Sequence, residues 1–121
     1  MSLSSSNVVE APVLEKKEVN YDPLIQWIDE LKEYESRGRP ERFRILDVNG
    51  KYSYSCLQFQ EETFIANQKK FDVKGGDIYD CDTQMKLALL MISNDHKEWR
   101  NWYTSVKKRG LGEPPKIEIP E

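Results

Sequence analysis

The sequence predicts a small α+β domain that is mainly helical and carries one β-hairpin after its first helix. Two observations support this. Apolar residues recur at helical spacing in four segments, residues 22–36, 60–71, 82–94 and 97–109. Between the first two segments, the dipeptide Asn49-Gly50, a strong hairpin-turn signal, separates two short stretches of alternating character. The folded part would span residues 21–110, which suits one domain with a modest core.

Composition narrows the possible partners. The chain has 121 residues, of which 38% are hydrophobic and 32% charged, with a net charge of -3. No run of about eighteen or more apolar residues occurs, so we expect no membrane span. The acidity argues against nucleic acid, which usually needs a basic patch. The first residues lack the apolar segment of a secretory signal, so either the protein is cytosolic or a signal is missing from this sequence.

The first 20 residues show no sustained period, and we expect a linker or disordered arm there. A helix follows over residues 22–36. Asp22 is its expected N-cap, because Pro23 suits the first helical position. Gly38 is its expected stop.

One carboxylate of this helix, Glu35, falls on the apolar face. At about 100° per residue it lies within the stripe formed by Leu24, Ile28 and Leu31. In one interpretation, Glu35 belongs to a fraying last turn and faces solvent. In the other, an apolar wall and the negative end of the helix dipole raise its pKa, so that it stays protonated near neutrality and can donate a proton.

The hairpin and the second helix come next. Residues 43–48 and 51–55 would form the two strands on either side of Asn49-Gly50. Residues 60–71 would form a helix with Phe64 and Ile65 facing inward.

Two further helices complete the domain. The third, capped by residues 82–84, is apolar nearly all round and is therefore expected at the centre. The fourth, residues 97–109, ends at Gly110 and carries one aromatic and aliphatic stripe made of Trp99, Trp102, Tyr103 and Val106. Residues 111–121, with three prolines, are expected to form an extended tail.

Two motifs resemble those of lytic transglycosylases and goose-type lysozymes, members of the lysozyme superfamily. Glu35-Ser36 resembles their Glu-Ser-Gly, and residues 53–59, Ser-Tyr-Ser-Cys-Leu-Gln-Phe, resemble their Ser-x-Gly-Leu-x-Gln-x, with Thr63 at the threonine beyond. The resemblance implies a lysozyme-like fold, with Glu35 as the general acid and with Ser55 and Gln58 in a sugar-binding cleft. The chain departs from the pattern at Arg37 and Ser55, where the family has glycine.

The hairpin resembles that of phage-type lysozymes, in which an aspartate and a hydroxyl residue six positions later hold the attacking water. Asp47 and Ser53 have this separation across Asn49-Gly50. The resemblance implies that Asp47 orients the water and that Ser53 assists it, as an inverting mechanism requires. Alternatively, Asp47 is an ordinary turn residue.

Other side chains have two interpretations each. Tyr52 and Tyr54 alternate with Ser53, so one face of their strand could contact glycan while the other packs. Tyr103, with Trp99 and Trp102, could stack on sugars or belong to the core. His96 has no second ligand at metal spacing, so neither a metal nor another cofactor is expected.

The sequence therefore predicts a peptidoglycan-cleaving glycosidase, a muramidase acting on the β-1,4 bond between N-acetylmuramic acid and N-acetylglucosamine. The alternatives are a lytic transglycosylase that gives 1,6-anhydro products, a peptidoglycan-binding module that has lost turnover, and a helical interaction domain without a cleft. The expected partners are glycan strands, bound by a monomer that is secreted, periplasmic or cell-wall associated. Because thiols oxidise there, we expect a disulfide between Cys56 and Cys81.

Overall fold

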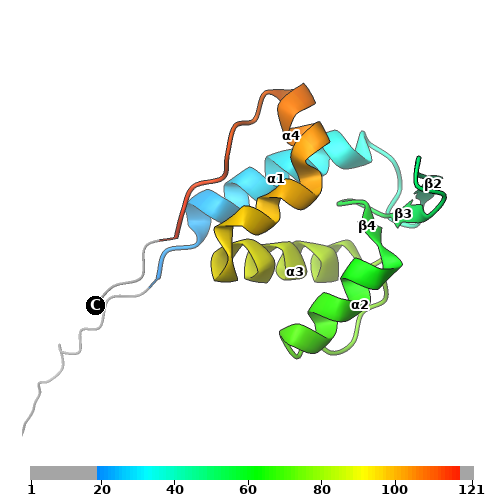
Figure 1. Cartoon of the computed structure of the whole chain (residues 1–121), viewed down its shortest axis with the longest axis horizontal. Coiled ribbons are helices and arrows are strands. Elements are labelled where there is room, and N and C mark those ends of the chain that lie inside the picture. Colours follow the sequence, from blue (N-terminus) through cyan, green and yellow to red (C-terminus); the bar gives the residue numbers. More distant parts are fainter. Residues whose placement is uncertain (1–18, 118–121) are drawn as a thin grey trace, which may run out of the picture.

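The structure, a computed structural model, describes residues 19–117. Its regular elements are α1 (Asp22–Ser36), β2 (Arg44–Leu46), β3 (Tyr52–Tyr54), β4 (Phe59–Gln60), α2 (Glu61–Lys70), α3 (Cys81–Asn94), the 3-10 helix η1 (His96–Trp102) and α4 (Tyr103–Arg109). The sheet lies at one end of the helical body, and the first and last described residues lie toward the other end (Figure 1). The protein is thus a mainly helical α+β domain, as predicted. The expected arm at residues 1–18 lies outside the described residues.

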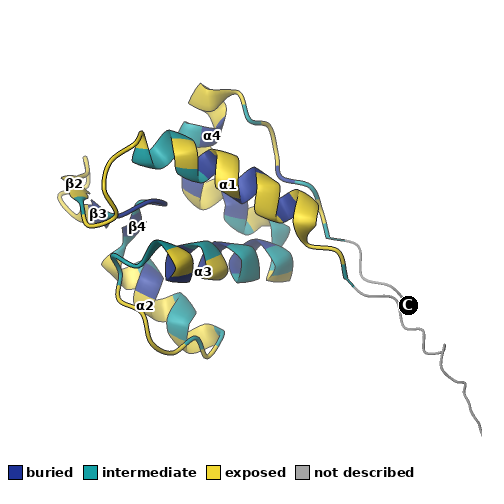
Figure 2. Cartoon of the chain, turned by 180° about the vertical axis from the view of Figure 1, so that it is seen from behind, coloured by how far each residue is buried: buried dark blue, intermediate teal, exposed yellow. Residues whose placement is uncertain are grey.

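The core forms around α3. This helix contacts α1, α2 and η1 and buries Leu87, Ala88, Met91 and Ile92. Buried positions of α1 and α3 lie on the sides that face the interior (Figure 2). The predicted stripe of α1 is confirmed, since Leu24, Ile28 and Leu31 are all buried, together with Trp27. The expected central position of the third helix is confirmed as well.

Both ends of α1 differ slightly from the prediction. The N-cap position is Tyr21, and Asn20 Oδ1 accepts a hydrogen bond of 3.1 Å from the Asp22 backbone N–H. At the other end the helix stops at Arg37, whose φ of 48° is left-handed, and Gly38 continues the turn with a φ of 76°. The chain therefore leaves the helix one residue before the expected glycine.

The sheet has three antiparallel strands in the order β2-β3-β4, one more than the predicted hairpin. The strand β4 was missed because it has only two residues and runs directly into α2. The connection between β2 and β3 covers residues 47–51 and is closed by a 2.8 Å hydrogen bond from Asp47 N–H to the Lys51 carbonyl. It is thus longer than the two-residue turn that Asn49-Gly50 indicates.

The later helices correct three predictions. Phe64 is buried as expected, but Ile65 is 44% exposed, so its predicted inward position is wrong. The third helix begins at Cys81 after the N-cap position Asp80, before the predicted cap at residues 82–84. The predicted fourth helix is divided into η1 and α4.

The division at Trp102 also explains which aromatic residues are buried. Side chains three residues apart eclipse one another in a 3-10 helix, so Trp99 and Trp102 both face the core. Tyr103, the next residue along the chain, turns outward and is 49% exposed. It therefore does not belong to the buried stripe that the sequence predicts.

The segment after Gly110 has no regular structure, yet its first part packs against the domain. The Trp27 indole Nε1 donates a 3.0 Å hydrogen bond to the Gly112 carbonyl, and His96 Nε2 lies 2.8 Å from the carbonyl oxygen of Pro114, which is buried. The packed unit thus continues past residue 110, the predicted end of the domain. Residues 118–121 of the expected tail lie outside the described residues.

No helix within residues 19–117 has the length and apolar character to cross a membrane.

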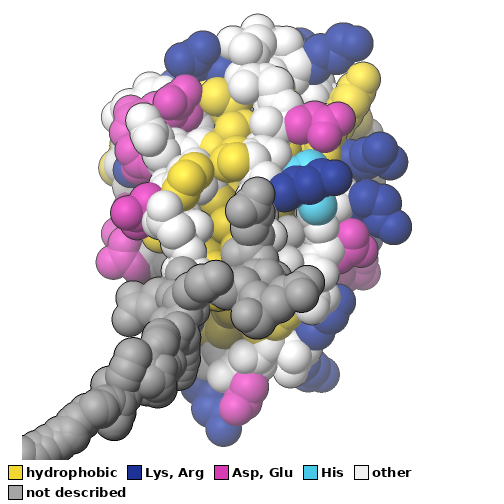
Figure 3. All heavy atoms as spheres, turned by 90° about the vertical axis from the view of Figure 1, so that its left-hand side faces the viewer, with side chains coloured by type: hydrophobic (Ala, Val, Ile, Leu, Met, Phe, Trp, Pro, Cys, Tyr) yellow, Lys and Arg dark blue, Asp and Glu magenta, His cyan; other side chains and the backbone are white. Residues whose placement is uncertain are grey.

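Surface charge is mixed at the end of the domain opposite the sheet. In the view of Figure 3, side chains of both charge signs surround a band of apolar side chains. A hollow of about 170 Å³ lies between α1 and α3, lined by Ile25, Ile28, Met85, Lys86 and Leu89.

Candidate active site

The turn between β2 and β3 holds one carboxylate by both of its oxygens. Asp47 Oδ1 accepts a 2.8 Å hydrogen bond from the Val48 backbone N–H, and Oδ2 accepts one of 2.9 Å from Ser53 Oγ. Ser53 is buried on β3, directly opposite Ile45 of β2. Asp47 is therefore part of the turn and also pairs with Ser53, as its six-residue separation from Ser53 predicts.

Gln60 of β4 completes this group, although no motif in the sequence predicts this role. Its Nε2 lies 3.3 Å from Asp47 Oδ2 and 3.4 Å from Ser53 Oγ. Its amide also exchanges two hydrogen bonds with Asn49, of 3.0 and 3.2 Å. The antiparallel register places Gln60 opposite Ser53, so this contact depends on the strand that was not predicted.

A pocket of about 260 Å³ opens beside these residues. Its walls combine one carboxylate, several uncharged polar side chains and two aromatic rings, from Asp47, Ser53, Gln58, Phe59, Gln60, Thr63, Asn101 and Trp102. Amide and hydroxyl groups can donate and accept hydrogen bonds, and aromatic rings offer apolar contact area. Such a lining suits a neutral, hydroxyl- and amide-rich ligand near a single negative charge.

Glu35 lies in the last turn of α1 and is partly buried. Burial raises the pKa of its carboxyl group above the ordinary value of 4.5, and the negative charge of Asp47 acts in the same direction. A hydrogen bond with Ser105 of α4 and the positive charge of Arg37 lower this pKa, but they do not reverse the shift. Glu35 does not line the pocket, but the pKa of its carboxyl group is raised and the negative charge of Asp47 lies within electrostatic reach of it.

A fully buried side chain, Gln84 of α3, holds the wall of the pocket in place. Its Oε1 accepts a 2.8 Å hydrogen bond from the Leu57 backbone N–H. Its Nε2 donates to the carbonyls of Tyr54 and Ile78, at 2.7 and 2.6 Å. Trp102 Nε1 adds a 2.8 Å hydrogen bond to the Leu57 carbonyl. In the sequence, Gln84 stands in the predicted cap of the third helix, and no local pattern marks it as buried.

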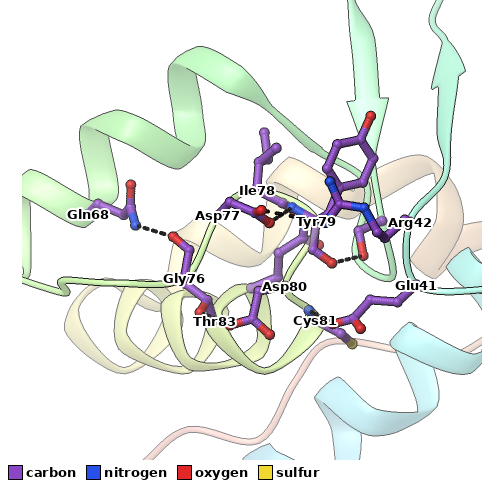
Figure 4. Close-up of polar contacts among 12 residues, drawn as sticks. Glu41, Arg42, Gln68, Gly76, Asp77, Ile78, Tyr79, Asp80, Cys81 and Thr83 are labelled. Atoms are coloured by element: carbon purple, nitrogen blue, oxygen red, sulfur yellow. Dashed lines mark hydrogen bonds and ion pairs between the residues drawn. The ribbon is translucent and has the colours of Figure 1, made fainter.

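The expected disulfide is present at the same wall. Cys56, in the segment between β3 and β4, is bonded to Cys81 at the start of α3, with the two Cα atoms 5.5 Å apart. A second contact lies next to it, because Glu41 Oε2 accepts a 2.7 Å hydrogen bond from the Cys81 backbone N–H. Figure 4 shows Glu41 reaching this N–H at the beginning of the helix. A negative charge there is favoured by the helix dipole.

Four of the expected ligand-contacting residues lie elsewhere. Ser55 is fully buried, and its Oγ donates a 2.9 Å hydrogen bond to the Tyr79 carbonyl, so its hydroxyl cannot reach a ligand. Tyr52 and Tyr54 flank Ser53 on β3 and project from the opposite face of the sheet, because neighbouring side chains alternate between faces. Tyr103 lines a different groove, together with Trp99 and Lys107.

The structure therefore brings Asp47, Ser53 and Gln58 together in one pocket, with Glu35 nearby, and leaves the three tyrosines outside it. Among residues 19–117, no three His, Cys, Asp or Glu side chains are grouped so that they could hold a metal ion. Comparison with family models, with curated proteins and with solved structures finds no match for this chain.

Proposed function

We propose that this protein is a lysozyme-like glycosidase that cleaves the β-1,4 bond between N-acetylmuramic acid and N-acetylglucosamine in peptidoglycan. Glu35 donates a proton to the glycosidic oxygen as the bond breaks. Asp47 and Ser53 hold the water that attacks the sugar from the other side, as in an inverting mechanism. The observation that carries the proposal is the raised pKa of the partly buried Glu35 within electrostatic reach of Asp47.

Backbone conformation supports the resemblance on which this proposal rests. The chain departs from the family pattern at Arg37 and Ser55, both of which stand where the family has glycine. Both adopt left-handed backbone angles, with φ of 48° and 61°. This is the region that glycine enters most easily. The backbone angles at both positions are thus ones that glycine adopts readily, which supports the resemblance.

Two alternatives use the same site. In a lytic transglycosylase, Glu35 is the only catalytic carboxylate and the 6-hydroxyl of the sugar captures the intermediate, which gives an anhydro product. In a binding module, the cleft holds glycan without cleaving it. The partial burial of Glu35 argues against a helical interaction domain without a cleft, which would leave this carboxylate in solvent. A disulfide agrees with a location outside the cytoplasm.

The test is a digest of purified peptidoglycan analysed by mass spectrometry. Wild-type protein should release muropeptides, and Glu35→Gln should lose about 10²- to 10⁴-fold in rate, the usual contribution of general acid catalysis. Glu30→Gln is the matched control, because Glu30 is an exposed carboxylate on the same helix. Full activity of Glu35→Gln would overturn the catalytic assignment. Binding without any wild-type cleavage would favour the binding module.

A further inference from the structure

The outer face of the sheet, opposite the pocket, carries a continuous row of arginine and tyrosine side chains. The Arg44 guanidinium lies 4.0 Å from the ring centroid of Tyr52. The ring centroids of Tyr52 and Tyr54 are 6.3 Å apart, and those of Tyr54 and Tyr79 are 5.3 Å apart. Arg42 closes the row, with its guanidinium 4.4 Å from the Tyr79 ring centroid. We call these five residues the arginine–tyrosine surface.

This surface is separate from the pocket around Asp47. Arg44 pairs with Tyr54 across the two strands, and Leu46 pairs with Tyr52, so these side chains share one face. Ser53 lies between the two tyrosines and points to the other face. Arg42 and Tyr79 approach the row from the segments before β2 and before α3, as Figure 4 shows for their stacked side chains.

The two arginines have unused hydrogen-bonding capacity. No carboxylate within the described residues forms an ion pair with Arg44. Arg42 has one such partner, Asp77, at 3.5 Å, and both side chains are exposed, so this pair is weak. A guanidinium that is stacked on an aromatic ring keeps its N–H edge free for a carboxylate or phosphate and is already oriented for it.

The local charge also differs from that of the whole chain. Residues 37–54 contain five basic side chains and two acidic ones, whereas the protein has a net charge of -3. Both acidic residues are already engaged, since Glu41 accepts from the start of α3 and Asp47 accepts from Ser53. Arg42 and Lys51 pair with Asp77 and Glu62 outside the segment, which leaves Arg44, with Arg37 and Arg39, as basic side chains that form no ion pair within residues 19–117.

The spacing of charge indicates what kind of anion fits. The arginines stand at the two ends of the row, and three uncharged tyrosines lie between them. Phenol groups suit amides and small apolar groups, because each combines a ring with a hydroxyl that donates and accepts. Leu46, 60% exposed beside Tyr52, adds apolar area. A ligand with sparse carboxylates separated by neutral peptide matches this pattern better than a polymer with a phosphate on every repeat.

We propose that the arginine–tyrosine surface binds the carboxylate-bearing peptide portion of the polymer whose glycan portion occupies the pocket. This proposal rests on the function proposed above. It gives the sheet two roles, because one face positions Ser53 for the glycan while the other face recognises the attached peptide.

The experiment measures binding by calorimetry in the full chain carrying Glu35→Gln, which prevents turnover. The probes are uncrosslinked glycan chains with their peptides, and the same chains after an amidase has removed the peptides. The test variant adds Arg42→Gln and Arg44→Gln. The control adds Lys86→Gln and Arg109→Gln instead, which removes two exposed charges outside the surface. We expect the test variant to bind the peptide-bearing chains about tenfold more weakly than the control, with no difference for the peptide-free chains.

Two further probes make every outcome decisive. The first probe is a synthetic alanyl-isoglutamyl peptide. If it binds in an arginine-dependent way while glycan does not bind at all, the result supports this surface and contradicts the proposed glycosidase. The second probe is sodium polyphosphate. If it binds in an arginine-dependent way and the peptide-bearing chains do not, the surface binds a phosphate polymer and the proposal is overturned. Equal binding of peptide-bearing chains by the test variant and the control would also overturn it, provided that their thermal unfolding midpoints agree.

Discussion

Ser53 Oγ lies 2.9 Å from Asp47 Oδ2 and donates a hydrogen bond to it across the turn that joins β2 and β3. The other oxygen of Asp47 is occupied by the Val48 N–H, and Gln60 approaches the shared oxygen from β4. The carboxylate is therefore held by the turn on one side and faces the pocket on the other. This arrangement can orient a water molecule. Because different oxygens of Asp47 serve the turn and the pocket, a substitution can change one function and keep the other.

Replacing Asp47 by asparagine tests how the intermediate is captured. Asparagine keeps an oxygen for the Val48 N–H, so the turn should persist, but it removes the negative charge. If the enzyme hydrolyses its substrate, the wild type should give products with reducing-end muramic acid. Asp47→Asn should then lose about 10²-fold or more in rate, and Ser53→Ala should lose less. Mass spectrometry of the products decides the matter. Anhydro products, with Asp47→Asn near full activity, would make Glu35 the only catalytic carboxylate.

Glu35 should make the stability of the protein depend on pH. Its pKa is raised in the folded protein, mainly by burial, above the ordinary value of 4.5. As the pH rises past this ordinary value, the unfolded chain loses the proton first, so the free energy of unfolding falls until the folded protein has also lost its proton. Glu35→Gln removes this effect. The variant should be more stable than the wild type at about pH 8 and gain nothing at about pH 4, measured by urea unfolding. An equal difference at both pH values would show that the effect is not titration.

Gln84→Leu should strongly destabilise the fold. The substitution leaves the Leu57 N–H and the carbonyls of Tyr54 and Ile78 without their partner in the interior. Each such group costs about 1 to 3 kcal/mol, so we expect the three together to lower the free energy of unfolding by about 3 kcal/mol or more. Urea denaturation measures it, with Gln26→Leu on the exposed face of α1 as the control. A loss similar to that of the control would mean that other contacts fix the pocket wall.

Reducing the disulfide should have a smaller effect on the fold. The bond between Cys56 and Cys81 closes a loop with a sequence separation of 25 residues. Closure of such a loop contributes about 3 kcal/mol by restricting the unfolded chain. Unfolding in urea with and without dithiothreitol gives the difference. Titration of two free thiols in the oxidised, native protein would reject the bond itself.

Glycine substitutions at the two left-handed positions should have opposite effects. Arg37 is exposed, so Arg37→Gly should relieve backbone strain and stabilise the protein by about 0.5 to 1 kcal/mol. Ser55→Gly relieves the same kind of strain but removes the buried hydrogen bond to the Tyr79 carbonyl, and the loss of this bond should outweigh the gain by about 1 kcal/mol. Thermal unfolding of both variants tests the contrast. Stabilisation of both would indicate that the Ser55 hydroxyl contributes little.

The sequence alone was sufficient to locate α1, to place Glu35 on its apolar face and to make α3 central, because the periodicity of side chains along a helix is a local property. The positive φ at Ser55 likewise follows a motif position where glycine is usual. The six-residue spacing of Asp47 and Ser53 was also visible, because the two strands of a hairpin are neighbours in the chain.

Tertiary structure alone decided which face of β3 meets the pocket. Alternation places Ser53 on one face of β3 and Tyr52 and Tyr54 on the other. Only the packing of the sheet against α2, and of Phe59 against Trp102 of η1, turns the face of Ser53 toward the pocket. The same holds for Gln60 and Gln84, whose partners lie on segments that the sequence does not show to be close. An amide gives the same local signal in solvent or in the core, and its role is set by the distant backbone groups that folding brings to it.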